Sequence, residues 1–241
     1  MFSLSALWNL NSFLVFCLLA LCSCSPTEKE SKTVESAIVV HEINADTIKI
    51  LNEHKLELTR AYARHHYGLD QYTLDSIKMV VIHYTVIPTL EETVALFKRD
   101  SLTSNRKYIG NFSRLNVGIH YIVDTDGSIY SLIPDSVIAR HIIGFNHVSI
   151  GIENIAASAS HLTDEQLASN VQLVKFLSDR HHTINYLIGH DEYNDTTLAH
   201  YSLYRSLDAN YTPYDKPDPG SQFMTRLRKA LKEEHGLEFR K

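Results

Sequence analysis

Apolar and polar positions along the chain predict a regular alternation of strands and helices. Residues 79–82 are four apolar residues in a row, and His83 follows them directly, which is typical of a buried strand that ends on a polar side chain. The sequence Thr-Leu-Glu-Glu at 89–92 then matches a capping box, in which a hydroxyl and a carboxylate satisfy free backbone amides. We therefore predict a helix from there to about Leu102.

The same pattern continues downstream. Residues 117–123 and 128–133 are rich in apolar residues, and the turn sequence Asp-Thr-Asp-Gly separates them, which predicts an antiparallel hairpin. The further predicted elements are a strand at 148–153, a helix capped by Thr163 and Gln166, a strand at 186–190, and a last helix that opens at Ser221 and ends at Gly236.

These elements mix strands and helices without an internal repeat, so the fold class that we predict is α/β. We expect a single domain over residues 78–235, with a central mixed β-sheet flanked by helices. Upstream, apolar residues recur at helical spacing from about Asp46 to Tyr67, and Gly68 is a plausible stop. Residues 46–77 are therefore predicted to form an accessory helical segment.

The amino-terminal segment is typical of an export signal. The apolar run from Phe13 to Leu21 is shorter than the ~20 residues that span a membrane, but it has the length of a signal-peptide core. Leu21-Cys-Ser-Cys24 resembles a lipobox, so residues 1–23 are predicted to be a lipoprotein signal peptide, with Cys24 lipidated and residues 24–45 forming the anchor and a polar tether. Residues 1–12 contain no Lys or Arg, which departs from the pattern. A cleaved signal without lipid and an uncleaved anchor are the alternatives.

Composition narrows the function classes. All three cysteines lie in the first 24 residues, so neither disulfides nor thiolate metal ligands are expected in the folded domain. The formal charge of -5 is mild, and no basic block is present, which argues against a nucleic-acid partner.

Histidine and aspartate mark the candidate chemistry. His83 and His190 each follow an apolar strand, and Asp218 lies in the sequence Lys-Pro-Asp-Pro-Gly at 216–220. Imidazole and carboxylate groups are good Zn²⁺ ligands, and three of them leave a fourth position for water. Because these residues are far apart in the sequence, spacing alone is a weak argument.

Six ordered motifs resemble those of the type 2 N-acetylmuramoyl-L-alanine amidases, a family that includes peptidoglycan recognition proteins and small phage amidases. The likeness covers about residues 78 to 235. The motifs are Val-Ile-His-Tyr-Thr at 81–85, Gly-Ile-His-Tyr-Ile-Val-Asp-Thr-Asp-Gly at 118–127, His-Ile-Ile-Gly-Phe-Asn at 141–146, Ser-Ile-Gly-Ile-Glu at 149–153, Gly-His at 189–190, and Lys-Pro-Asp-Pro-Gly at 216–220.

This resemblance implies zinc-dependent hydrolysis of the amide between N-acetylmuramic acid and L-alanine in peptidoglycan, for cell-wall turnover or remodelling. The implied zinc ligands are His83, His190 and Asp218. Glu153 would move the proton, and Lys216 would stabilise the oxyanion. Members that only bind peptidoglycan often lose a ligand, and none is missing here, which favours an enzyme.

The resemblance also implies less certain roles and shows two departures. His141 and Asn146 are expected to contact the substrate, and His120 to lie in the core. Ile119 replaces a catalytic tyrosine of phage and recognition-protein amidases, so Glu153 is assigned its role; the alternative is that Glu153 only positions other groups. The second departure is an insertion at 191–215, between His190 and Asp218. Its tyrosines could line a groove or pack the loop itself: Tyr193, Tyr201, Tyr204, Tyr211 and Tyr214.

Two other classes of function remain open at this point. A non-catalytic peptidoglycan-binding lipoprotein would use the same cleft with an idle metal site, and an envelope scaffold lipoprotein would explain the anchor but not the motifs. The expected partners are peptidoglycan and, through the lipid, a membrane. We expect a monomer in the cell envelope, at the periplasmic side of the outer membrane or at the surface.

Overall fold

The computed structural model describes residues 40–42 and 50–241, which fall in one compact unit, residues 37–241. The predicted signal peptide, Cys24 and most of the tether lie outside the described residues. Within the described part of the chain, no helix has the length and apolar character needed to cross a membrane.

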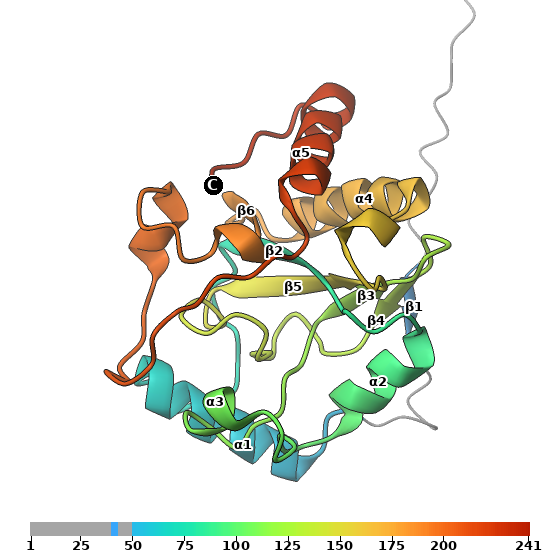
Figure 1. Cartoon of the computed structure of the whole chain (residues 1–241). Helices are drawn as coiled ribbons and strands as arrows, with labels where there is room; N and C mark the ends of the chain where they lie inside the picture. The colour runs from blue at the N-terminus through green and yellow to red at the C-terminus, as the bar shows by residue number, and fades with distance from the viewer. Residues whose placement is uncertain (1–39, 43–49) are drawn as a thin grey trace, which may run out of the picture. The chain divides into compact units, whose positions relative to one another are not determined.

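A six-stranded mixed sheet forms the centre of this unit (Figure 1). The strand order is β1-β4-β3-β5-β2-β6, and the neighbouring strands are parallel except for β3 and β4, which form the predicted antiparallel hairpin. The strands are β1 (Val40–Glu42), β2 (Met79–Tyr84), β3 (Tyr121–Val123), β4 (Ile129–Ser131), β5 (Ser149–Asn154) and β6 (Tyr186–Gly189).

Helices lie on both sides of the sheet, which confirms the predicted architecture. Figure 1 shows α4 and α5 on one side and α1, α2 and α3 on the other. The helices are α1 (Glu53–Tyr67), α2 (Leu90–Lys98), α3 (Lys107–Gly110), α4 (Asp164–Arg180) and α5 (Ser221–His235), with short 3₁₀ turns η1 (Ala159–His161), η2 (His190–Glu192) and η3 (Ala199–Leu203).

Most of the predicted helix ends are confirmed by their capping bonds. Thr163 and Gln166 form a reciprocal capping box at the start of α4. Gly68 and Gly236 end α1 and α5 with φ angles of 63° and 66°, a left-handed conformation that glycine adopts without steric cost. Thr89 caps α2, but this helix ends at Lys98 and not near Leu102, so that boundary was wrong.

The alternation of side chains in β2 separates the core from the candidate site. Val80 and Ile82 pack in the cluster that contains the apolar side chains of α4 and α5, whereas Met79 and Val81 pack in a different cluster. Successive strand residues point to opposite faces, so His83 lies on the same face as Met79 and Val81. The buried apolar residues of β2 therefore anchor His83 on the face opposite α4 and α5.

The helix α1 packs against the same domain. Its Tyr62, Ala63 and Tyr67 are 1%, 0% and 0% exposed and belong to the main core cluster. Asn52 caps its start by accepting a hydrogen bond from the backbone of Lys55. The predicted accessory segment thus contains a helix that contributes to the core of the domain.

Candidate metal centre and catalytic pocket

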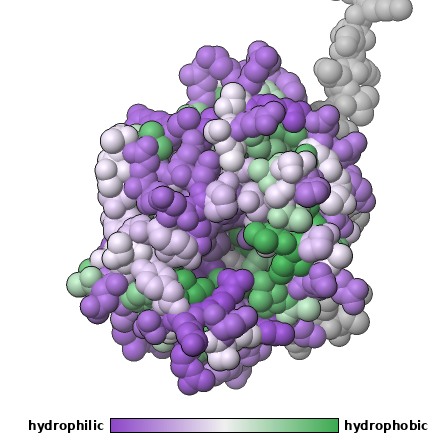
Figure 2. All heavy atoms as spheres, in the orientation of Figure 1, coloured by the Kyte–Doolittle hydropathy of each residue, from purple (hydrophilic) through white to green (hydrophobic). Residues whose placement is uncertain are grey.

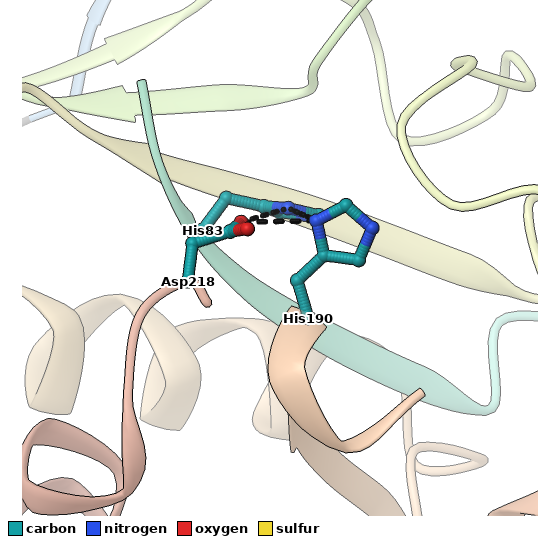
Figure 3. Close-up of side chains that lie close together, drawn as sticks. All are labelled: His83, His190 and Asp218. Carbon is teal, nitrogen blue, oxygen red and sulfur yellow. Dashed lines mark hydrogen bonds and ion pairs between the residues drawn. The ribbon is translucent and has the colours of Figure 1, made fainter. Parts of the chain in front are cut away.

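Three side chains from separate parts of the chain point toward one another (Figure 3). His83 comes from β2, His190 from the turn after β6, and Asp218 from the segment before α5. The Nδ1 atoms of His83 and His190 are 3.0 Å apart, and Oδ2 of Asp218 lies 3.1 Å and 2.9 Å from them. All three residues are buried.

The sheet explains why residues 107 positions apart in sequence meet. β2 and β6 are parallel neighbours, with Ile82 opposite Gly189, so the next residue on each strand is a histidine at the same edge. The backbone amide of Asp191 donates to the carbonyl of Asp218 at 2.7 Å, which holds the third residue beside them. A Cβ at Gly189 would lie 2.2 Å from Oδ1 of Asp191 and 2.9 Å from Pro219, so this close approach requires glycine.

The protonation states suit a cation. Burial, together with the neighbouring His83, lowers the pKa of His190 to about 4, so its imidazole is neutral at neutral pH. Burial alone would raise the pKa of Asp218, but hydrogen bonds and charge interactions with His190 and His83 outweigh it and hold this pKa below its usual range. A neutral imidazole and a carboxylate are the forms that bind a metal ion.

The spacing of the three atoms also fits zinc. In a tetrahedral site with bonds of about 2.0–2.1 Å, ligand atoms lie roughly 3.3 Å apart. The observed separations of 2.9–3.1 Å are close to this value. The residues present therefore fit a small divalent cation.

The cluster lies in a pocket of about 210 Å³. Apolar side chains contribute to its wall, among them Val86, Phe97 and Ile143, together with the polar groups of Glu153 and Lys216. Figure 2 shows a hollow near the centre of one face, with hydrophobic residues gathered along one side of it. A mostly apolar cleft with a few convergent polar groups is typical of a substrate site.

Glu153 stands beside the cluster on the neighbouring strand. It is paired with His83 in the β2–β5 register, and its side chain lines the pocket. Its Oε2 atom is buried and has no hydrogen-bond partner among the described residues. Burial, with a contribution from the charge of Asp218, raises the pKa of the Glu153 carboxyl well above its usual range, so this carboxyl holds a proton more readily than an exposed one.

Lys216 brings a positive charge to the same pocket. Its Nζ atom donates to the hydroxyl of Tyr214 at 2.6 Å and lies 4.0 Å from the centre of that ring. Tyr214 is in turn held by Tyr193, whose hydroxyl donates to the carbonyl of Tyr214 and accepts from its amide. The loop thus restricts the position of the ammonium group.

The structure corrects the expected substrate contacts. Asn146 is 0% exposed, and its amide is used inside the protein: Oδ1 accepts from the backbone of His141 and Ile142, and Nδ2 donates to Tyr62. Asn146 therefore supports a loop and does not face the substrate. His141 lines the pocket, but both of its ring nitrogens lie near protein partners, His83 and Ser149.

Two other expectations concern buried residues. His120 is fully buried, as expected; its Nε2 bonds to the carbonyl of Val137 and its Nδ1 accepts from the amide of Gly151. Ile119, at the position of the family's tyrosine, is also fully buried in an apolar cluster. His200, which is part of η3, is likewise 0% exposed, and its Nε2 bonds to the carbonyl of Tyr193.

The tyrosines of the insertion divide between the two proposed roles. Tyr193, Tyr211 and Tyr214 line the pocket, whereas Tyr201 and Tyr204 stack on each other at 5.0 Å between ring centres and pack the loop. The insertion therefore both builds the wall of the pocket and stabilises itself.

Arg140 is a pocket residue that sequence reasoning missed. It is 2% exposed, and its guanidinium donates to the carbonyls of Ile109, Ser113 and Leu115, which fixes the opposite wall. No local pattern marks it, because a buried arginine satisfied by distant carbonyls has no sequence periodicity of its own.

The fold and this pocket define an α/β domain with a candidate metal centre. A family model described as N-acetylmuramoyl-L-alanine amidase matches residues 73–221, more than half of the chain. The chain therefore belongs to this family of type 2 amidases and is an amidase that acts on peptidoglycan.

Solved structures with a similar fold include amidases and a recognition protein. The chain is 16% identical to the N-acetylmuramoyl-L-alanine amidase LysC from Clostridium intestinale URNW, covering 83% of this chain and 99% of that one with a TM-score of 0.48. An AmpD structure is 23% identical, with 65% of this chain and 86% of that one covered and a TM-score of 0.44. PGRP-SA from Apis mellifera is 20% identical, with 55% of this chain and 82% of that one covered and a TM-score of 0.40. No curated protein matches the sequence.

Proposed function

We propose that this amidase is zinc-dependent and hydrolyses the amide bond between the lactyl group of N-acetylmuramic acid and L-alanine, in cell-wall turnover or remodelling. The convergence of His83, His190 and Asp218 in the pocket carries the proposal. When bound there, zinc would polarise the amide carbonyl and lower the pKa of a water molecule toward ~7.

The protein's own residues complete the chemistry. Oε2 of Glu153, buried and without a partner among the described residues, would accept a proton from the attacking water and then pass it to the departing amine of L-alanine. The water oxygen ends in the lactyl carboxylate, and the protons are conserved. Nζ of Lys216, restrained by Tyr214, would donate to the oxygen on which negative charge develops.

We also propose that the protein acts in the cell envelope, anchored to a membrane by a lipid on Cys24. The apolar run Phe13–Leu21 and the lipobox-like Leu21-Cys-Ser-Cys24 support this location. Because one chain supplies all the proposed ligands, we further propose that it acts as a monomer. Labelling with a radioactive fatty acid, lost in Cys24→Ala, would test the anchor; equal labelling of the variant would contradict it.

The metal requirement is tested by measuring the release of stem peptide from purified peptidoglycan. We expect a chelator to abolish release and added Zn²⁺ to restore it, with about one zinc bound per chain. Asp218→Ala should lose both zinc and activity. Asp215→Ala is the matched control, because this carboxylate is exposed and bonds to Asn194. Full activity in the chelated protein would contradict the proposal.

A further inference from the structure

His141 lies directly behind the proposed ligand His83. Its Nδ1 atom is 3.0 Å from Nε2 of His83, and the two rings meet nearly at right angles, with centres 5.1 Å apart. On the other side, Nε2 of His141 is 3.4 Å from the hydroxyl of Ser149. The ring of His141 therefore bridges the proposed ligand and the sheet.

With a cation bound at Nδ1 of His83, the hydrogen-bond pattern allows one consistent set of tautomers. Nδ1 of His83 faces His190 and Asp218, so it must present a lone pair if it binds a cation. The proton of His83 is then on Nε2 and is donated to Nδ1 of His141. A neutral imidazole has one donor and one acceptor nitrogen, so His141 carries its own proton on Nε2, toward Ser149.

The space for this ring depends on a glycine in β5. A Cβ added at Gly151 would lie 2.7 Å from Nδ1 and 2.8 Å from Cγ of His141, closer than unstrained atoms approach. The amide of the same residue donates to His120. The missing side chain at Gly151 therefore leaves the space beside β5 that the ring of His141 occupies.

The backbone of His141 is held from the opposite direction by α1. Oδ1 of Asn146 accepts from the amides of His141 and Ile142 at 3.1 Å and 2.7 Å, and its Nδ2 donates to the hydroxyl of Tyr62 at 2.7 Å. That hydroxyl is 3.0 Å from the hydroxyl of Tyr67. A continuous chain of bonds therefore runs from α1 to the proposed ligand.

We propose that α1, which precedes the residues matched by the family model, acts as a positioning element for the metal centre: Tyr62 fixes Asn146, Asn146 fixes the loop of His141, and His141 sets the tautomer and orientation of His83. This inference rests on the proposed zinc site. Groups that orient a metal-binding histidine change metal affinity by about 10–100-fold when they are removed.

The test compares zinc dissociation constants by chelator competition. We expect His141→Ala to weaken zinc binding about 10–100-fold, and His141→Asn to restore most of it, because the amide oxygen of asparagine can accept where Nδ1 did. Tyr62→Phe, which removes one hydroxyl from a buried ring, should weaken binding by a smaller factor. His161→Ala is the control, because this histidine is exposed and bonds to Ser158, outside the chain of bonds from α1 to His83.

A second measurement separates this inference from the proposed function. Imidazole ¹⁵N–¹H spectra of the zinc-bound protein should show a proton on Nε2 of His83 that exchanges slowly with water in the wild type and faster in His141→Ala. Zinc binding that is equal in wild type, His141→Ala and Tyr62→Phe would overturn the inference while leaving the zinc amidase intact. If the wild type bound no zinc, the proposed function would fail, and this inference would fail with it.

Discussion

Replacing Glu153 with glutamine should separate catalysis from stability. The two side chains have the same shape, and Oε2 of Glu153 accepts no hydrogen bond from the described residues, so the substitution breaks no hydrogen bond at that atom. It also removes an ionisable group whose pKa is raised by burial, which means that the charged form is costly in the folded protein. We therefore expect unfolding to be unchanged or slightly less favourable.

The effect on turnover should be large. Proton transfer by a positioned side chain contributes about 10²–10⁴-fold to a rate, and each factor of ten corresponds to about 1.4 kcal/mol. Glu153→Gln should therefore raise the activation free energy by about 3–5 kcal/mol, because an amide cannot accept the proton of water. The Michaelis constant should change little, since no substrate contact is assigned to this oxygen.

The assay measures kcat and KM for stem-peptide release by chromatography, with zinc content and thermal unfolding on the same preparations. Glu234→Gln, the same substitution at an exposed position of α5, serves as the comparison. Retention of more than about a third of wild-type kcat in Glu153→Gln, with zinc bound, would refute the proton-transfer role. In that case Glu153 would only position its neighbours.

Three further results are expected. Lys216→Met should lower kcat about 10–1,000-fold with little change in melting temperature, because its bonded partner Tyr214 is 41% exposed and water can replace the lost bond; an unchanged kcat would exclude the oxyanion role. Arg140→Met should lower the free energy of unfolding by about 3 kcal/mol, measured in urea, because three carbonyls lose their donor; wild-type stability would show that water replaces it. Burial lowers the pKa of His66 and of His120 to about 4. As the pH falls below about 6.5, these two histidines therefore become protonated in the unfolded chain before they do so in the folded protein. Each histidine should lower the free energy of unfolding by about 2 kcal/mol at pH 5, and an equal free energy of unfolding in urea at pH 7 and pH 5 would contradict this.

The strand ends were predictable because burial leaves a clear pattern. An apolar run followed by His83 or His190 predicts a polar side chain at the edge of a sheet, and the capping sequence at Thr163 predicts the start of α4, as the structure shows. Which strands are neighbours depends on pairings between distant residues, so only the resemblance to a family indicated that Asp218 belongs with the two histidines.

The roles of Asn146 and His141 could not be predicted for a different reason. Both are polar residues in a motif near the pocket, and such residues can serve either the ligand or the backbone. The choice depends on whether a partner approaches from elsewhere, and here Tyr62 of α1 supplies it. A helix that precedes the motif by about 80 residues in sequence leaves no local signal at Asn146.

Mass spectrometry of peptidoglycan digested by the zinc-loaded protein in H₂¹⁸O tests the central claim most directly. Hydrolysis of the amide between N-acetylmuramic acid and L-alanine predicts free peptides that begin with L-alanine, and one ¹⁸O atom in the lactyl carboxylate of the glycan. Intact muropeptides, or a new terminus and label at any other bond, would contradict the account.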